Sequence, residues 1–208
     1  VFLSNFKLSS THSPYIMTKL GLGTAAIGRP HYINIRNAAN TFSSDLATFS
    51  MRGMQMLDEA YKQGVRYFDT APGYGMAEKL LTEWIHKHQY SDVEIATKWG
   101  YTYVANFQAN ATQHEVKEHS LSKLNEQWEV SKKLLPCLST YQIHSATFES
   151  GVLENHAVLN RLAELKATQN LKIGLSSTGA NQLEVLKKAL EIEVEGKLLF
   201  DTFQVTYN

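Results

Sequence analysis

The sequence predicts an α/β fold, a (β/α)8 TIM barrel of which about six β/α units are present in 208 residues. Short β-like runs alternate with longer stretches of helical period, a pattern typical of parallel βαβ units. Six such strands with five intervening helices fit either an open doubly wound sheet or part of a closed barrel. Polar residues at the ends of successive strands favour the barrel, because all its βα loops meet at one mouth.

Length and composition indicate a single globular domain over residues 1–208, with 43% apolar and 19% charged residues. Basic and acidic residues number 20 each, so no net charge attracts nucleic acid or an anionic membrane. A small-molecule partner is therefore expected. The longest apolar runs fall well short of the roughly 18 residues of a membrane span. The single cysteine, Cys137, agrees with a reducing compartment, so the cytoplasm is the expected location.

The first two β/α units are predicted near the N-terminus. A β-like run covers about Lys19 to Thr24, and the polar stretch Arg29 to Ser50 is too long for an ordinary βα loop. We expect that loop to border a binding site. A helix follows over about Met51 to Gln63, with Gly64 placed as its C-terminal stop. The second strand, Val65 to Asp69, comes directly after it.

The middle of the chain contains the clearest helix. Its residues recur at helical spacing at Ala77, Leu80, Leu81, Trp84, Ile85 and His88. Val93 to Thr97 is predicted to be the third strand. The segment Thr112 to Glu115 has the form of a capping box, which predicts that the next helix begins there and continues through Val116 to Trp128.

Three further strands complete the pattern. Pro136 precedes a strand that ends near His144, and a helix is predicted over about Val152 to Thr168. The fifth strand is Leu171 to Ser176. The last helix runs from Asn181 to Leu190 and is followed by a sixth strand; that strand is predicted over Phe200 to Tyr207.

Asp69, Lys98, His144 and Ser176 all fall at or just past the ends of predicted strands. The loop after the second strand also presents Tyr74. A tyrosine of ordinary pKa, about 10, is a weak acid that needs a nearby cation to stabilise its phenolate. Lys98 supplies such a cation, and Asp69 offsets the cost of burying it. His144 is suited to hydrogen-bond a substrate oxygen or to relay a proton.

Asp69, Tyr74, Lys98 and His144, in this order and context, resemble the catalytic tetrad of the aldo-keto reductases. Gly21 to Thr24, Asp69-Thr70-Ala71 and Gln204 to Asn208 also resemble segments of that family. The resemblance implies a carbonyl reductase that uses NADP(H) to reduce an aldehyde or ketone. Tyr74 would be the proton donor, Lys98 and Asp69 its tuning pair, and His144 the group that orients the carbonyl.

The resemblance also implies cofactor contacts. Thr24 and Asp69 would lie near the nicotinamide ribose, and Ser176, Ser177 and Gln204 near the carboxamide. Ser177 stands where the family usually has asparagine. The seventh and eighth strands, which hold the phosphates in such barrels, are absent from the sequence. We therefore expect a barrel that is incomplete at its C-terminus.

Other motifs carry weaker signals. Gly21 to Ala26 matches the G-x-G-x-x-A pattern of dinucleotide-binding Rossmann folds, but Gly28 to Pro30 would break the helix that this pattern needs. The pairs His86 with His88 and His114 with His119 lack the spacing that places two imidazoles on one helical face, so no metal site is expected.

Two alternatives to a carbonyl reductase stay open. The subunits that regulate voltage-gated potassium channels, the channel β subunits, resemble the same family and keep a bound nicotinamide cofactor, so a nicotinamide-binding regulatory subunit is one alternative. An inactive fragment is the other. The substrate, the choice between NADPH and NADH, and the oligomeric state are not specified by the residues.

Overall fold

The computed structural model of the protein describes residues 2–4, 20–30, 45–108 and 110–206. Seven strands of this described part form one sheet, in the order β1-β11-β8-β7-β4-β3-β2. Their bounds are β1 Phe2–Ser4, β2 Gly21–Gly23, β3 Tyr67–Asp69, β4 Glu94–Trp99, β7 Leu138–Ile143, β8 Lys172–Ser177 and β11 Thr202–Val205. All neighbours from β2 to β11 pair in parallel, whereas β1 pairs antiparallel with β11. The parallel strands form part of a (β/α)8 barrel, as predicted.

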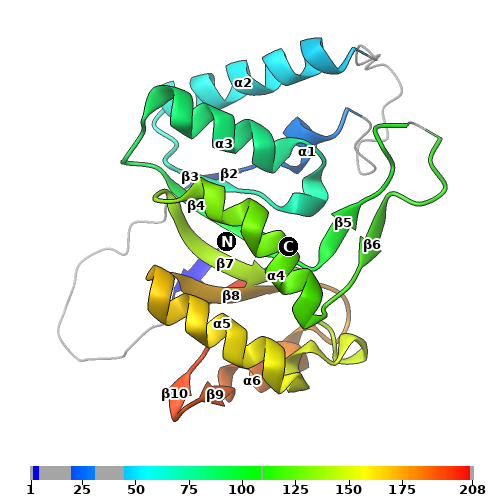
Figure 1. Ribbon diagram of the computed structural model, residues 1–208, viewed down its shortest axis with the longest axis vertical. Coiled ribbons are helices and arrows are strands. Elements are labelled where there is room, and N and C mark those ends of the chain that lie inside the picture. Colours follow the sequence, from blue (N-terminus) through cyan, green and yellow to red (C-terminus); the bar gives the residue numbers. More distant parts are fainter. Residues whose placement is uncertain (1, 5–19, 31–44, 109, 207–208) are drawn as a thin grey trace.

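The helices follow one another along the sheet in chain order, from α2 at the top of Figure 1 to α6 at the bottom. Their bounds are α1 Ala25–Gly28, α2 Leu46–Lys62, α3 Ala77–His88, α4 Leu121–Ser131, α5 His156–Gln169 and α6 Gln182–Leu190. Single 3-10 turns are η1 Pro72–Tyr74, η2 Lys132–Leu134, η3 Phe148–Ser150 and η4 Val152–Glu154. None of the helices in the described ranges combines the length and apolar character that crossing a membrane requires.

The core lies between the sheet and this helical layer. Trp84 of α3 packs on Phe68 of β3 with ring centroids 5.1 Å apart, and both side chains are almost fully buried. The predicted apolar face of α3 is buried except for His88, which is exposed at the end of the helix. Burying one large apolar side chain contributes about 1.5–3 kcal/mol, so this face anchors α3 to the sheet.

Several predicted boundaries differ from the structure at the N-terminal end. Helix α2 begins at Leu46 rather than Met51, because the carboxylate of Asp45 accepts hydrogen bonds from the backbone of Ala47 and Thr48. Lys19 and positions 31–44 of the predicted long loop lie outside the described residues. Helix α1 ends after one turn at Gly28, so the segment from Gly21 does not open a Rossmann helix.

The predicted capping box at Thr112 to Glu115 is wrong. Residues Glu115–Lys117 form strand β6, which pairs antiparallel with β5, Tyr101–Tyr103. The helix begins only at Leu121, where the hydroxyl of Ser120 accepts a hydrogen bond of 3.1 Å from the backbone N–H of Lys123. The ladder with β5 satisfies the backbone around Val116, so a helix has no advantage there. Figure 1 shows this hairpin projecting from the sheet.

Two smaller differences occur in the C-terminal half. Helix α5 begins at His156 after the turn η4, because the side chain of Asn155 accepts from the backbone N–H of Val158. A short hairpin of β9 Glu193–Val194 and β10 Lys197–Leu198 follows α6 and was not predicted. Tyr207, the last residue of the predicted sixth strand, lies outside the described residues.

Candidate active site

Three adjacent parallel strands bring the predicted tetrad together. Strand β3 ends at Asp69, β4 carries Lys98 next to its end, and β7 ends one residue before His144. The register pairs Asp69 with Ala96 and Lys98 with Gln142. Tyr74 follows β3 in the turn η1. All four side chains therefore lie at the carboxyl ends of the strands, where barrels bind their ligands.

Lys98 is the central contact of the group. Its Nζ lies 2.7 Å from both carboxylate oxygens of Asp69, 3.1 Å from the carbonyl oxygen of Thr70 and 3.3 Å from the hydroxyl of Tyr74. Only 1% of the Lys98 side chain is exposed. The ammonium thus donates to three partners inside the protein, and one of them is the tyrosine hydroxyl.

The charge of Lys98 is set by two opposing influences. Burial acts to lower the pKa of Lys98, but the negative charges available on Asp69 and Tyr74, and the hydrogen bonds to both, raise it above its usual value. The net direction is upward. Lys98 is therefore a permanent cation beside the tyrosine hydroxyl at neutral pH.

His144 faces the ring of Tyr74 edge-on, with ring centroids 5.5 Å apart and an interplanar angle of 87°. Burial, followed by the positive charges of Lys98, His119, Arg29 and Lys117, holds the pKa of His144 well below its usual range. The imidazole is therefore neutral at pH 7. Its Nδ1 is buried with no hydrogen-bond partner among the described residues.

The backbone at His144 is held from the side of strand β4. The N–H of His144 donates to the carbonyl of Trp99 at 2.9 Å, and its own carbonyl accepts from Nε2 of His119 at 3.0 Å. Gly100 has a φ of +110°, and a Cβ there would overlap the ring of His119. The side chain of Gln127 accepts from the backbone N–H of Gly100 at 2.7 Å. These contacts fix the strand ends that carry Lys98 and His144.

A small cavity of about 180 Å³ opens between the tetrad and the ends of β8 and β11. It is lined by Tyr74, Lys98, His144, Ser145, Ser176, Ser177, Thr178, Gln204, Val205 and Thr206. The hydroxyl of Ser176 accepts a hydrogen bond of 2.8 Å from the backbone N–H of Ser145. The side-chain oxygen of Gln204 is buried with no partner in the described part of the chain.

Thr24 lies beside Asp69 but does not line this cavity. Both its backbone N–H and its hydroxyl donate to the carbonyl oxygen of Asp69, each at 2.9 Å. Thr24 therefore supports the strand end that carries the carboxylate. Its predicted ribose contact stays a prediction.

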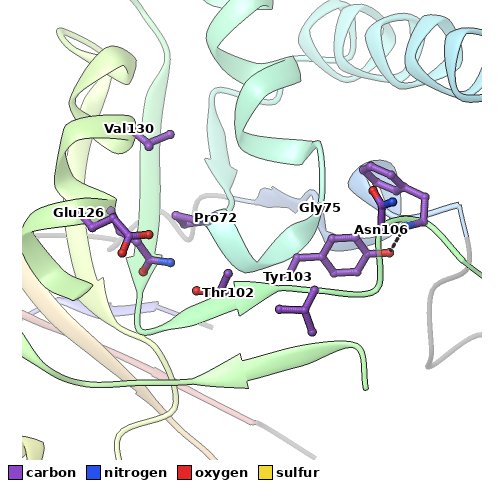
Figure 2. Close-up of a pocket in the computed structure, with 10 residues that line it drawn as sticks. Pro72, Gly75, Thr102, Tyr103, Asn106, Glu126 and Val130 are labelled. Atoms are coloured by element: carbon purple, nitrogen blue, oxygen red, sulfur yellow. Dashed lines mark hydrogen bonds between the residues drawn. The ribbon is translucent and has the colours of Figure 1, made fainter. Parts of the chain in front are cut away.

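A second cavity, of about 400 Å³, is lined by residues of the turn η1, strand β5 and helix α4 (Figure 2). Its wall includes Pro72, Gly75 and Tyr103, together with Glu126 and Val130 of α4. The hydroxyl of Tyr103 accepts from the backbone N–H of Phe107 at 3.2 Å. None of the predicted catalytic residues lines this cavity, so it does not belong to the tetrad.

The model of the aldo/keto reductase family matches residues 19–208. The chain belongs to this family. A search of curated proteins gives no match.

Solved aldo-keto reductases have a similar fold. A Pseudomonas aeruginosa protein described as an aldo-keto reductase has a TM-score of 0.57 and 25% identity over 82% of this chain. A thermostable aldo-keto reductase, solved with the inhibitor epalrestat, has a TM-score of 0.57 and 24% identity over 92%. Glycerol dehydrogenase from Gluconobacter oxydans has a TM-score of 0.57 and 19% identity over 81%. The chain spans 57%, 59% and 47% of the lengths of these three proteins.

Some residues around the site were not predicted from the sequence. Ser145, Thr178 and Thr206 line the cavity. Ser145 and Thr178 directly follow the predicted site residues His144 and Ser177, whereas Thr206 lies inside the predicted sixth strand and one residue past the end of β11. A hydroxyl residue next to a strand end was therefore the available signal. Arg29, whose guanidinium lies 5.8 Å from the ring centroid of Tyr74, had no such signal, because it falls in the predicted loop.

Proposed function

We propose that this aldo-keto reductase reduces a small aldehyde or ketone to the alcohol with NADP(H), and that Tyr74 is the general acid. The observation that carries the proposal is the position of the Lys98 ammonium. It lies within hydrogen-bonding distance of both the Asp69 carboxylate and the Tyr74 hydroxyl. A buried cation at a phenol favours the phenolate that remains after proton transfer.

Each member of the tetrad has a separate task in this proposal. Tyr74 donates its hydroxyl proton to the carbonyl oxygen as negative charge develops there. Lys98 stabilises the resulting phenolate, and Asp69 keeps the ammonium charged in its buried position. The tyrosine regains its proton from solvent before the next turnover.

His144 suits the role of a neutral hydrogen-bond donor. Its lowered pKa keeps the ring uncharged. A buried N–H without an acceptor costs more than an unused lone pair, so the proton is expected on Nε2 rather than on the unpartnered Nδ1. The Nε2–H is then available to hold the substrate oxygen near Tyr74.

The cavity also fits the carboxamide end of a nicotinamide. The unpartnered oxygen of Gln204 is an acceptor for an amide N–H. The hydroxyl of Ser176, which accepts from Ser145, keeps its own proton to donate to a carbonyl oxygen. Ser177 completes this wall. When bound, the reduced nicotinamide supplies the hydride. The preference for NADP(H) is proposed from the family resemblance. The cytoplasmic location is proposed from the single cysteine.

The test is turnover of a panel of aldehydes and ketones, followed by loss of NADPH absorbance. Wild-type protein and a Tyr90→Phe control, altered in the loop before strand β4, are expected to turn over at similar rates. Tyr74→Phe is expected to turn over about 10² to 10⁴ times more slowly. Binding of NADPH without turnover of any carbonyl would instead support the nicotinamide-binding regulatory role. Equal activity of Tyr74→Phe and wild type would remove Tyr74 from the reaction.

A further inference from the structure

Arg29 is a buried cation that the proposed reaction does not use. Only 3% of its side chain is exposed, and it directly follows the one-turn helix α1. Its Nη2 donates both to the carbonyl oxygen of Gly73 and to the Glu115 carboxylate, the latter at 2.6 Å. The guanidinium carbon lies 5.8 Å from the ring centroid of Tyr74 and 5.0 Å from that of Tyr103. Arg29 therefore contacts both the turn that carries Tyr74 and the β5–β6 hairpin.

The backbone next to Arg29 is packed against the same turn. The carbonyl of Gly28 accepts from the backbone N–H of Met76 at 3.0 Å. A Cβ on Gly28 would overlap the carbonyl oxygen of Tyr74 and the backbone of Ala77. Segment 28–29 therefore contacts the chain immediately before, at and after Tyr74. A displacement of the turn away from this segment would break the hydrogen bonds from Met76 to Gly28 and from Arg29 to Gly73.

The surroundings of this contact suit a guanidinium rather than an apolar side chain. A buried guanidinium is costly unless paired, and here the Glu115 carboxylate and the Gly73 carbonyl both accept from it. Its flat face also suits the neighbouring aromatic ring of Tyr103. Glu115 lies in strand β6 and Tyr103 in β5, so the two hairpin strands hold the cation from one side and the turn from the other.

We propose that Arg29 is a positioning residue that fixes the Tyr74 turn, and with it the Tyr74 hydroxyl beside Lys98, by linking Gly73 to the β5–β6 hairpin. Its catalytic consequence rests on the function proposed above. A displacement of about 1 Å at a reacting group reduces rates by about 10²-fold. Arg29 therefore affects turnover through the position of Tyr74 and not through a contact with the substrate.

The kinetic test compares Arg29→Met with Arg29→Lys, which keeps the charge but not the planar donor group. We expect kcat to fall by about 10- to 100-fold in Arg29→Met and by less in Arg29→Lys, with KM within about threefold of wild type. In a Tyr74→Phe background, Arg29→Met should cause no further fall in kcat, because the acid it positions is gone. An equal loss in both backgrounds would overturn the proposal.

Hydrogen exchange tests the same proposal without activity. In Arg29→Met and in Glu115→Gln, the amides of Tyr74 and Met76 should exchange faster than in wild type, while that of Leu175 in β8 is unchanged. Unchanged exchange at Tyr74 and Met76 would overturn the positioning role even in an active enzyme. If Arg29→Met does not fold, Arg29→Lys and Glu115→Gln decide. Failure of the proposed function is recognised separately, by full turnover of Tyr74→Phe or by a wild-type protein that reduces no carbonyl.

Discussion

The ammonium nitrogen of Lys98 lies 2.7 Å from each carboxylate oxygen of Asp69, and the exposed fractions of the two side chains are 1% and 11%. Each of these buried charges is stabilised by the other, because removing one would leave the other buried without a counter-charge. The pair therefore serves both stability and the charge beside Tyr74. Substitutions of Tyr74 and of Lys98 separate those two effects.

Tyr74→Phe removes the acidic hydroxyl and keeps the ring that packs against His144. We expect kcat to fall by about 10² to 10⁴, because a general acid acts mainly in the transition state. Cofactor affinity should change little. Steady-state kinetics and a fluorescence titration with NADPH measure the two quantities, and a large loss of affinity with unchanged kcat would assign Tyr74 to binding instead.

Lys98→Met leaves Asp69 as a buried carboxylate without its partner. We expect a loss of about 3–5 kcal/mol in the free energy of unfolding, measured by urea denaturation. The double variant Lys98→Met/Asp69→Asn removes both charges and should lose less than the sum of the single losses. In any Lys98→Met protein that folds, the alkaline limb of the kcat profile should move to higher pH, since a phenol without a nearby cation ionises less readily. Additive losses together with an unmoved profile would contradict the coupling.

Glu78 on helix α3 gives a prediction for the pH dependence of stability. Its Oε1 accepts from Thr97 at 2.7 Å and from Ser131 at 2.8 Å, while Oε2 has no partner among the described residues. Burial raises the pKa of Glu78 from 4.5 to about 7, against the opposing effect of these two hydrogen bonds. The unfolded chain releases this proton near pH 4.5 and the folded protein only near pH 7, so stability falls as the pH rises between these values.

Glu78→Gln should remove that loss. We compare the free energy of unfolding of the variant with that of wild type at two pH values. The difference should favour the variant by about 3 kcal/mol more at pH 8 than at pH 4. Urea denaturation at both pH values measures the difference. Glu83→Gln, the same substitution at an exposed position of the same helix, is the matched control. A pH-independent effect of Glu78→Gln would show that the carboxyl is already ionised well below pH 7.

Gly100 has no room for a side chain beside the ring of His119, and this can be tested by substitution. Gly100 and Gly64 both have positive φ, +110° and +91°, but a Cβ at Gly64 meets nothing within 4 Å whereas one at Gly100 overlaps the ring of His119. Gly64→Ala should therefore cost only the backbone strain of about 1–2 kcal/mol. Gly100→Ala should cost about 1–3 kcal/mol more and should also lower kcat, because His119 supports the carbonyl of His144. Equal losses at the two positions would show that the His119 ring moves aside freely.

Much of the fold was predictable because its pattern is local. The helical spacing from Ala77 to Ile85 marks one buried face, and the β-like runs around Asp69 and Lys98 are short and bounded by turns. Asp69, Lys98 and His144 could be proposed as neighbours because parallel strands end at a common edge. No knowledge of packing was needed for these inferences.

The remaining features depend on contacts between distant parts of the chain. Arg29 and Glu115 are 86 positions apart, so neither residue signals the other in the sequence. The helix start at Thr112 was predicted wrongly because the capping-box pattern is a short polar segment that includes a glutamate. A segment of that composition also occurs in hairpins. There the pairing of Val116 with Thr102 decided the structure, and that pairing is not a local property.

The register of the strands has a consequence for how this protein tolerates change. Neighbouring residues of β4 point to opposite faces: Lys98 contacts Asp69, whereas Thr97 contacts Glu78 in the helical layer. Inserting or deleting one residue within β4 would exchange these two positions and send the cation toward α3. Changes in the length of the connecting loops leave the ladder intact. We therefore expect natural variation in length to accumulate in the loops around the mouth, where it can alter which molecules enter, while the proton-transfer apparatus keeps its dimensions.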